Sequence, residues 1–373
     1  MPFIDLKAQY RLLKSDIDAR IQRVLDSGAF ILGPEVAELE AELARWAGVR
    51  HAIGVANGTD ALQIALMIER IGPGDAVFLP SFTYAATAEA AVLVGATPVF
   101  VDVDAGTFNV DPDDLDARIA AVAKAGKLRP KALIAVDLFG QTADYRRLAP
   151  VMERHGLHLV SDAAQSFGGK LDGKAVGSLA PITTTSFYPS KPLGCYGDGG
   201  AILTDDPAKA ELVRSIRFHG TSSSDRYDMA RIGMNSRLDT IQAAVLLAKL
   251  KVFARELETR ERVARIYDSR LGNLVAVPVR APGVTSSWAQ YTVQVDRRDQ
   301  VAARLKSAGI PTAIYYQRPL HLQSAYRHYG QGAGSLPVSE QVADRVLSLP
   351  IHGYLDDAAA QRVCDAVAQA VGS

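Results

Sequence analysis

Two residues of this chain could perform covalent and acid–base chemistry together. Lys191 lies in the run Ser186–Gly194 (SFYPSKPLG), and Asp162 lies twenty-nine residues upstream, at the end of an apolar run. A lysine amine can form a Schiff base with an aldehyde, and a carboxylate can keep a pyridine nitrogen protonated. Pyridoxal phosphate (PLP) is a cofactor that needs both groups. The sequence therefore predicts a PLP site with Lys191 and Asp162 as its catalytic residues.

Each of the two residues also has a plainer interpretation. A single lysine is most often a solvated surface residue, and Asp162 could simply cap the turn that follows it. The flanks of Lys191 favour the functional interpretation, because an apolar run precedes it and the glycine-rich segment Gly194–Gly200 follows it. Such flanks are typical of a lysine that turns into a pocket. A buried aspartate also needs a polar or charged partner, and a pyridinium N–H would be one.

Other residues could bind the phosphate and the ring of the same cofactor. The segment Asn57–Asp60 (NGTD) joins a predicted strand to a predicted helix, and free backbone amides at a helix start favour an anion. The same letters also describe an ordinary turn followed by a helix cap, so the signal is weak alone. Ser186 could add a hydroxyl group to the phosphate, and Gln165 could reach the phenolic oxygen. Tyr84 could stack on a flat heterocycle, although core packing would explain it equally well.

Signals for nucleotides and metals are weak in the sequence. It contains no Gly-x-x-x-x-Gly-Lys-Ser/Thr motif, and no Gly-x-Gly-x-x-Gly follows the first predicted strand, which disfavours nucleoside triphosphates and dinucleotides. The seven histidines do not have metal-ligand spacing, so we expect no metal. His219 could bind a ligand or could be an exposed residue near a helix end.

Short apolar runs alternate with helical segments between His51 and Thr204. Continuous apolar strands separated by helices are typical of an α/β fold, in which helices cover both faces of a largely parallel sheet. Ligands bind beyond the carboxyl ends of the strands in such sheets. Asp162, Asp137 and the segment 57–59 each follow a predicted strand, which brings them toward one crevice. The predicted strands are His51–Ala56, Ala76–Leu79, Pro98–Val103, Ala132–Val136, Leu157–Ser161, Thr183–Phe187 and Gly200–Leu203, with helical segments such as Asp60–Ile71 and Thr87–Leu93 between them.

The remainder of the chain predicts a second, smaller unit. One long helix is predicted over Arg237–Leu271, and a connector rich in proline, glycine and serine follows at Pro278–Ser287. We therefore predict a large α/β domain over residues 1–250 and a small α+β domain over residues 251–373. The small domain contains the strand-like segments Gln290–Val295 and Thr312–Tyr316 and the helical segments Gln300–Ala308 and Asp356–Val371.

The overall composition is that of a globular protein without a strong charge bias. The chain has 373 residues, of which 41 are basic, 41 are acidic and 48% are hydrophobic. Balanced charge argues against a broad surface for nucleic acid or anionic membrane. Cys195 and Cys364 are too few and too isolated for a disulfide framework, so we expect reduced thiols. The N-terminus lacks a signal-peptide core, and no apolar run reaches the roughly 20 residues of a membrane helix, which predicts a cytoplasmic location.

Taken together, these motifs resemble those of the DegT/DnrJ/EryC1/StrS family of sugar aminotransferases over nearly the whole chain. The family consists of PLP enzymes of fold type I, which is the fold of aspartate aminotransferase. The resemblance implies a large domain with a mostly parallel sheet, a smaller C-terminal domain, and pyridoxamine phosphate as the second form of the cofactor. The matching segments are Gly33–Val36, Ala56–Leu62, Phe82–Thr87, Asp162–Ser166, Ser186–Lys191, Gly197–Ala201 and Asn235–Asp239.

The resemblance also implies a role for each matching polar residue. Lys191 would form the Schiff base and carry the substrate proton, while Asp162 would pair with the pyridinium nitrogen. Gln165 would contact the phenolic oxygen, and Tyr84 would stack on the ring. A homodimer would complete the active site, with one phosphate contact supplied by the second subunit. The implied phosphate ligands are the amides of Gly58 and Thr59, Ser186, and Asn235 from the second subunit.

Three segments, 186–201, 235–244 and 288–293, are most similar to aminotransferases that act on UDP-2-acetamido-2-deoxy-ribo-hexuluronate. This similarity implies transfer of an amino group from L-glutamate to C3 of a UDP-linked 3-keto uronic acid, for surface polysaccharides such as O-antigen. Arg237 would bind the substrate carboxylate, because a guanidinium fork matches two oxygens. The other candidates for binding substrate are His219, Tyr315 and Tyr316.

Three different functions also remain open. The acceptor could be another nucleotide-linked 3-keto sugar or a 4-keto-6-deoxy sugar, because many relatives carry His-Tyr where this chain has Tyr315 and Tyr316. A PLP-dependent sugar dehydratase on the same fold would carry a histidine in place of Lys191. A non-catalytic regulatory relative would not need Lys191, Asp162 and Gln165 together. The polar segment Thr221–Asp225 could form a lid over any of these sites.

Overall fold

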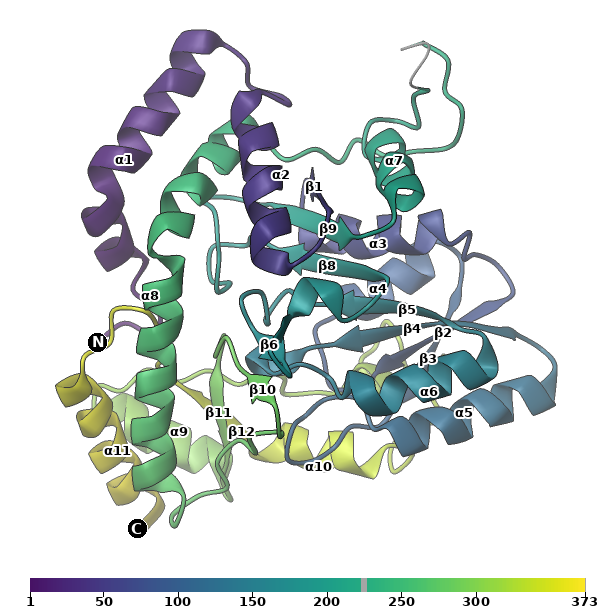
Figure 1. Cartoon of the computed structure of the whole chain (residues 1–373). Helices are drawn as coiled ribbons and strands as arrows, with labels where there is room; N and C mark the ends of the chain where they lie inside the picture. Colours follow the sequence, from purple (N-terminus) through teal and green to yellow (C-terminus); the bar gives the residue numbers. More distant parts are fainter. Residues whose placement is uncertain (223–226, 373) are drawn as a thin grey trace.

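A seven-stranded sheet forms the centre of the molecule in the computed structural model, which describes residues 1–222 and 227–372. Its strands are β1 (His51–Val55), β2 (Asp75–Pro80), β3 (Thr97–Val101), β4 (Arg129–Val136), β5 (His158–Asp162), β8 (Ile182–Ser186) and β9 (Gly200–Thr204). Their order is β1-β9-β8-β5-β4-β2-β3 (Figure 1). Only β9 runs against its neighbours, so the other six strands share one direction. The predicted, largely parallel α/β sheet is confirmed, and each of its seven predicted strands is present.

Helices cover both faces of the sheet, which explains why its strands are apolar along their length. On β2, Val77 and Leu79 join the core under one layer of helices, while Ala76 and Phe78 join the core under the other. The first layer contains α3 (Gly58–Ile68), α4 (Ala86–Leu93) and α7 (Pro207–Ile216). The second layer contains α2 (Pro34–Ala47), α5 (Pro112–Ala125) and α6 (Tyr145–His155) (Figure 1).

The long helix α8 (Thr240–Leu271) links the sheet region to the C-terminal part. Its N-terminal half packs on α1 (Leu6–Ser27) and α2, and its C-terminal half packs on α11 (Asp357–Gly372) (Figure 1). The helix begins at Thr240 rather than at the predicted Arg237, because Asp239 adopts the extended backbone of a helix cap. The proposed domain division after residue 250 falls inside this helix and stays a prediction.

A second hydrophobic core lies in the C-terminal part, around a two-stranded antiparallel sheet. Strand β11 (Tyr291–Gln294) pairs with β12 (Val346–Leu349), and α9 (Arg298–Ser307) and α11 pack against them. Helix α10 (Pro337–Arg345) contributes instead to the core of the large sheet. The smaller elements are the strands β6 (Lys170–Leu171), β7 (Lys174–Ala175) and β10 (Val284–Thr285) and the 3-10 helices Leu138–Gly140, Val176–Ser178 and Leu320–Leu322. Within the described ranges, no helix is both long and apolar enough to cross a lipid bilayer.

The predicted strand Thr312–Tyr316 is wrong. Its β-branched and aromatic residues are typical of a strand, but in this fully described segment only Ala313 makes a β-bridge, to Ser348. Tyr315 and Tyr316 instead line a cavity at the edge of the large sheet. Residue type alone does not distinguish aromatic side chains that face a cavity from those that pack between strands.

Candidate active site

A cavity of about 730 Å³ opens where the parallel strands end. Strands β1, β4, β5 and β8 run in one direction, so their carboxyl ends meet at one edge of the sheet. Asp162 is the last residue of β5, Ser186 is the last residue of β8, and Asn57 follows β1 closely. Of the residues predicted for the site, nine line the cavity: Gly58, Thr59, Tyr84, Asp162, Gln165, Ser186, Lys191, Tyr315 and Tyr316.

Lys191 and Asp162 share this cavity and influence each other's charge. Burial raises the pKa of Asp162, while the Ala164 amide and the charge of Lys191 oppose this rise. Burial lowers the pKa of Lys191, and Asp162 opposes that change. A lowered pKa gives a lysine more of its neutral amine, the form that attacks an aldehyde. Among the described residues, the Asp162 carboxylate accepts one hydrogen bond, from the Ala164 amide (3.1 Å), so its other oxygen can accept an N–H from a ligand.

The loop that carries Lys191 is held from behind by a buried lysine. Lys249 on α8 is 2% exposed, and its amine donates to the Gly194 carbonyl. The same amine lies 4.2 Å from the centre of the Tyr196 ring, where the ring quadrupole stabilises a cation. Burial lowers the pKa of Lys249 to about 8. The sequence did not predict this role, because a lysine within a long helix is normally solvated.

The start of α3 forms an anion site in the cavity wall. The Asn57 side chain caps this helix by accepting from the Asp60 amide (2.8 Å). The amides of Gly58 and Thr59 have no partner within the described part of the chain, and both residues line the cavity. A Cβ atom at Gly58 would lie 2.7 Å from the Cβ of Ser186, so glycine lets the helix start and the serine approach each other. Two amides and one hydroxyl group are thus available to a phosphate.

We expect Gly58→Val to weaken PLP binding about tenfold or more, because the added side chain must displace Ser186 from the anion site. Fluorescence titration of the cofactor-free protein with PLP measures the dissociation constant. Gly372→Ala is a matched control, since a Cβ atom there meets no atom within 4 Å. An unchanged dissociation constant in Gly58→Val would contradict this assignment of the phosphate site.

Aromatic side chains form another wall of the cavity. Tyr84 is exposed, and its ring centre lies 6.0 Å from that of Tyr316. The Tyr316 hydroxyl accepts a hydrogen bond from the side-chain amide of Gln165 (3.2 Å), and burial raises the pKa of Tyr316. The side-chain oxygen of Gln165 accepts from the Phe139 amide (2.6 Å). These two bonds fix the orientation of the Gln165 amide and leave it a second N–H for a phenolic oxygen.

Three predicted site residues, His219, Asn235 and Arg237, do not line this cavity. Asn235 is exposed and forms a β-bridge with Phe218. Arg237 donates to the Asn235 side chain and lies 4.8 Å from the centre of the Phe218 ring. His219 is exposed and has a positive φ of 60°. The cavity of their own chain therefore does not account for the roles predicted for these residues. The predicted lid Thr221–Asp225 extends into residues 223–226, which lie outside the described residues.

Asp137 lies at the same edge of the sheet, where its amide donates to the Asp162 carbonyl (3.0 Å), but it lies beneath the cavity rather than in its lining. It is wholly buried and is not part of the cavity lining. One carboxylate oxygen accepts from the Ala143 amide (2.8 Å) and the Tyr145 hydroxyl (2.8 Å), and the other accepts from the Ser166 hydroxyl (2.6 Å). Ser166 lies in the turn that follows β5, next to Gln165 and four residues after Asp162. Asp137 therefore fixes this turn from below.

Burial raises the pKa of Asp137 to about 7, whereas an unfolded aspartate titrates near ~3.9. The folded state therefore holds an extra proton between these values. This proton stabilises the folded state fully below about pH 4, and the stabilisation is lost as the pH rises through about 7. In the wild type, this titration lowers the free energy of unfolding between about pH 5 and about pH 8. Asparagine stays neutral, so we expect this decrease to be roughly 2–3 kcal/mol smaller in Asp137→Asn. Urea unfolding of the cofactor-free protein measures this, and parallel pH curves for the two proteins would contradict it.

The cavity lining is more acidic than basic. Asp60, Asp162 and Asp198 face a single cation, Lys191. Gln290 also lines the cavity and is 8% exposed, and its side-chain oxygen is buried without a hydrogen-bond partner in the described chain. It can accept a hydrogen bond from a ligand. Gln290 lies in the segment 288–293, which matches related aminotransferases, but that similarity assigned it no role.

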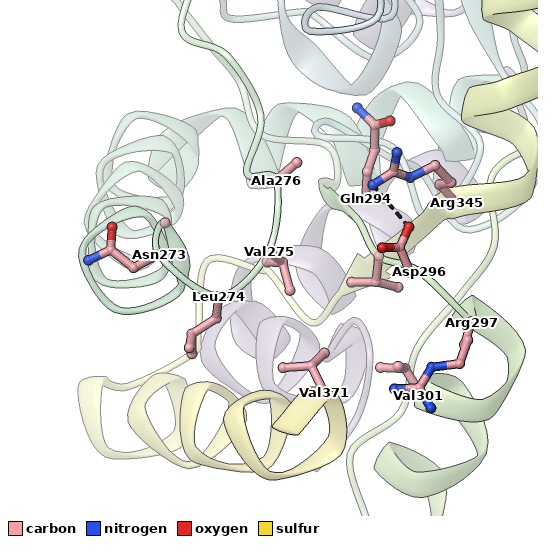
Figure 2. Close-up of a pocket in the computed structure, with 12 residues that line it drawn as sticks. Asn273, Leu274, Val275, Ala276, Gln294, Asp296, Arg297, Val301, Arg345 and Val371 are labelled. Atoms are coloured by element: carbon pink, nitrogen blue, oxygen red, sulfur yellow. Dashed lines mark ion pairs between the residues drawn. The ribbon is translucent and has the colours of Figure 1, made fainter. Parts of the chain in front are cut away.

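A second hollow, of about 430 Å³, lies in the C-terminal part and contains none of the predicted site residues. Residues 272–276, the end of β11 and the last turn of α11 surround it (Figure 2). Arg345 and Asp296 form an ion pair there (3.2 Å), drawn as a dashed line in Figure 2. Its described lining has no lysine, so it offers no amine for a Schiff base.

Comparison with known proteins identifies the family of this chain. Residues 12–368 match the family model of the DegT/DnrJ/EryC1/StrS aminotransferases. A UDP-2-acetamido-2-deoxy-3-oxo-D-glucuronate aminotransferase from Pseudomonas aeruginosa is 48% identical to this chain, and the alignment covers 98% of this chain and 99% of that protein.

Solved structures show the same fold over the full length. A DegT DnrJ EryC1 StrS aminotransferase from Brucella abortus superposes with a TM-score of 0.97 at 52% identity, covering 100% of both chains. Spr1654 from Streptococcus pneumoniae is 26% identical to this chain, and its alignment covers 96% of this chain. The structure of its PLP form has a TM-score of 0.88, and 96% of that chain is covered. The structure of its PMP (pyridoxamine phosphate) form has a TM-score of 0.89, and 95% of that chain is covered. The predicted fold class is thus confirmed. The chain belongs to the DegT/DnrJ/EryC1/StrS aminotransferase family and is a sugar aminotransferase.

Proposed function

We propose that this enzyme transfers the amino group of L-glutamate to C3 of UDP-2-acetamido-2-deoxy-3-keto-glucuronate, with PLP as its cofactor, in surface polysaccharide biosynthesis. The proposal is carried by one observation: Lys191, Asp162 and the free amides at the start of α3 line a single cavity. The 48% identity to the Pseudomonas aeruginosa enzyme supports this choice of acceptor.

The residues of the cavity fit PLP. When bound, the cofactor supplies an aldehyde for an amine and a ring that withdraws electrons from the substrate carbon. Lys191 would hold the aldehyde end, the free oxygen of Asp162 would pair with the ring nitrogen, and Gln165 would donate to the phenolic oxygen. Tyr84 would cover the ring. The phosphate would be held by the amides of Gly58 and Thr59 and by the Ser186 hydroxyl.

Lys191 is the proton carrier in this proposal. Its lowered pKa increases the fraction of neutral amine, which takes the proton from Cα of glutamate and later delivers a proton to C3 of the sugar. The negative charge of Asp162 keeps the ring nitrogen protonated and so stabilises the charge that develops on carbon. Glutamate becomes 2-oxoglutarate and the sugar ketone becomes an amine. One water enters in the first half and one leaves in the second, so the atoms balance.

A second subunit completes the site in this proposal. Glutamate, the uronate and the diphosphate are all anions, whereas the described lining of one chain has three carboxylates and one lysine. Additional cations must therefore come from outside this lining. Asn235 and Arg237 lie together at the surface, outside their own cavity, and are available to a neighbouring subunit. We propose a homodimer in which Arg237 of the second subunit binds the uronate carboxylate.

Two half-reactions test the acceptor. Glutamate is added first, and the visible absorbance of the lysine-bound cofactor should disappear as pyridoxamine phosphate forms. After the glutamate is removed, separate samples receive the UDP-linked 3-keto uronate and dTDP- or GDP-linked 4-keto-6-deoxy sugars. We expect only the uronate to restore the absorbance. Recovery with a 4-keto sugar alone would refute the acceptor and leave the reaction class intact.

Mass spectrometry of the sugar product in the same samples distinguishes an aminotransferase from a dehydratase and from a regulatory relative. Amine transfer replaces the ketone oxygen by nitrogen, whereas a dehydratase removes a hydroxyl group without adding nitrogen. A regulatory relative would leave both glutamate and every sugar unchanged. The presence of Lys191 in the cavity supports the first outcome.

A further inference from the structure

A small buried cavity lies behind the lysine loop, which we define as residues 189–194. Its volume is about 20 Å³. Its walls come from the beginning of the chain and α1, from the lysine loop, from α8, and from the segment 352–354 beyond β12. Lys191 belongs to the lining of both this cavity and the larger one. The beginning of the chain and α1 therefore lie next to the residues that pack behind the lysine loop.

Three side chains in the walls are almost wholly buried, and each has one polar atom without a hydrogen-bond partner among the residues that the structure describes. These side chains are Gln9 (8% exposed), Arg260 (4%) and His352 (3%), and the atoms are Oε1, Nε and Nε2. Buried polar atoms normally find a partner, because an unpaired one loses its hydration without compensation. Three such atoms around one cavity point to a shared ligand.

The other hydrogen bonds of these side chains determine which atoms donate. Gln9 Nε2 donates to Glu256 (2.9 Å), so Gln9 Oε1 is an acceptor. The Tyr354 amide donates to His352 Nδ1 (3.2 Å), so a neutral His352 carries its proton on Nε2. Burial and the charge of Arg260 lower the pKa of His352 to about 4, which keeps the ring neutral at ordinary pH. Arg260 Nε is always a donor. The three residues that line the cavity therefore carry two donors and one acceptor without partners in the described chain.

We propose that this cavity binds one water molecule, which bridges Gln9, Arg260 and His352. Water can accept from both donors and donate to the acceptor, so it satisfies all three atoms at once. A volume of about 20 Å³ admits one water and nothing larger. An ammonium ion has no lone pair for the two donors. A halide ion cannot donate to Gln9 Oε1, and the carboxylate of Glu256 in the same wall would repel it.

The bridging water ties three parts of the chain together behind the lysine loop. Gln9 belongs to α1, Arg260 to α8, and His352 to the segment beyond β12. Arg260 also donates to the Trp288 carbonyl (2.8 Å), two residues from Gln290 in the larger cavity. The water thus connects the N-terminal helix to the polypeptide that shapes the substrate cavity. This role is independent of which sugar the enzyme uses.

A crystal structure of the cofactor-loaded enzyme with ordered solvent tests the site directly. We expect one solvent peak within about 3.2 Å of Gln9 Oε1, Arg260 Nε and His352 Nε2. A crystal soaked in bromide identifies a halide by its anomalous signal. An anomalous peak at the site, an empty cavity, or a direct bond between Gln9 and His352 would each overturn the proposal.

Two substitutions of His352 separate the water from general packing. His352→Gln keeps an N–H donor at the end of its side chain, whereas His352→Leu has none. We expect the leucine variant to lose the solvent peak and to lower Tm by about 2 °C or more, and the glutamine variant to keep the peak with Tm within about 1 °C of wild type. Equal Tm shifts in the two variants, or a peak retained in the leucine variant, would contradict the bridge.

Discussion

Lys191→Ala should abolish transamination, with kcat lowered by at least about 10³-fold. Lys191 is the only lysine in the described lining of the cavity, so its removal leaves the cofactor aldehyde without an amine and the substrate Cα without a base. The phosphate and ring contacts remain, and we therefore expect the variant to bind PLP without the visible absorbance of the lysine-bound form. Absorbance spectra and the rate of 2-oxoglutarate release measure the two effects.

Two controls distinguish loss of chemistry from loss of fold in this experiment. Lys174→Ala changes an exposed lysine on β7 and should leave both the spectrum and the rate unchanged. Lys191→Arg keeps a cation at the site, yet its guanidinium stays protonated and cannot act as the amine, so it should be as inactive as alanine. A substantial rate in either Lys191 variant would end the proposed mechanism, whichever sugar is the acceptor.

The strands that position the site were predictable because their signal is local. The run that contains β5 begins with apolar residues and ends in Asp162, while β8 is rich in the β-branched residue threonine and ends in Ser186, so the sequence itself indicates both strands. The rule that parallel strands present their carboxyl ends at one edge then brings these residues together. Asp137 satisfies the same pattern and nevertheless lies below the cavity. The position of a residue in the sequence predicts that it lies at the edge of the sheet. Whether its side chain reaches the cavity or is buried below it depends on the groups that donate hydrogen bonds to it.

The conformation of residues that reach the cavity from the C-terminal part could not be predicted from local pattern, and only the family resemblance named Tyr315 and Tyr316 as candidates for the site. Tyr315 and Tyr316 have strand-forming side chains, and their place in the cavity wall depends on packing against residues such as Tyr84, far away in the chain. The role of Lys249 was equally unpredictable, because only its contact with the Gly194 carbonyl reveals it. Strand β12 has four residues and is recognisable only through its partner β11. Long-range contacts of this kind are absent from any local pattern.

Some of the predicted residues lie outside the cavity of their own chain. Asn235 and Arg237 matched family motifs, yet neither lines the cavity of its own chain. The sequence indicated that they matter but could not show to which cavity they belong. The structure of one chain separates two groups: nine predicted residues that line one cavity, and three (His219, Asn235 and Arg237) that lie outside it. In the proposed homodimer, Asn235 and Arg237 are available to the neighbouring subunit.

Asp162→Asn should lower kcat by about 10²- to 10⁴-fold while leaving the fold intact. Asparagine has nearly the same volume and can still accept the hydrogen bond from the Ala164 amide, so the substitution removes the charge and little else. Without that charge the ring nitrogen loses its proton, and the ring withdraws electrons from the substrate carbon less strongly. Circular dichroism should match wild type, and single-turnover kinetics with glutamate measure the loss.

A second expected result for Asp162→Asn distinguishes the proposed role of Asp162 from a purely structural one. The charge of Asp162 opposes the fall in the pKa of Lys191, so its removal should lower the pKa of that amine further. In the cofactor-free protein, the reaction of Lys191 with an aldehyde reagent should then begin at a lower pH than in wild type, because more neutral amine is present. Asp162→Glu, which keeps the charge, should leave that onset near the wild-type value. If Asp162→Asn shifted the onset to higher pH, or if it retained full kcat, the carboxylate would not act on either the lysine or the ring as proposed.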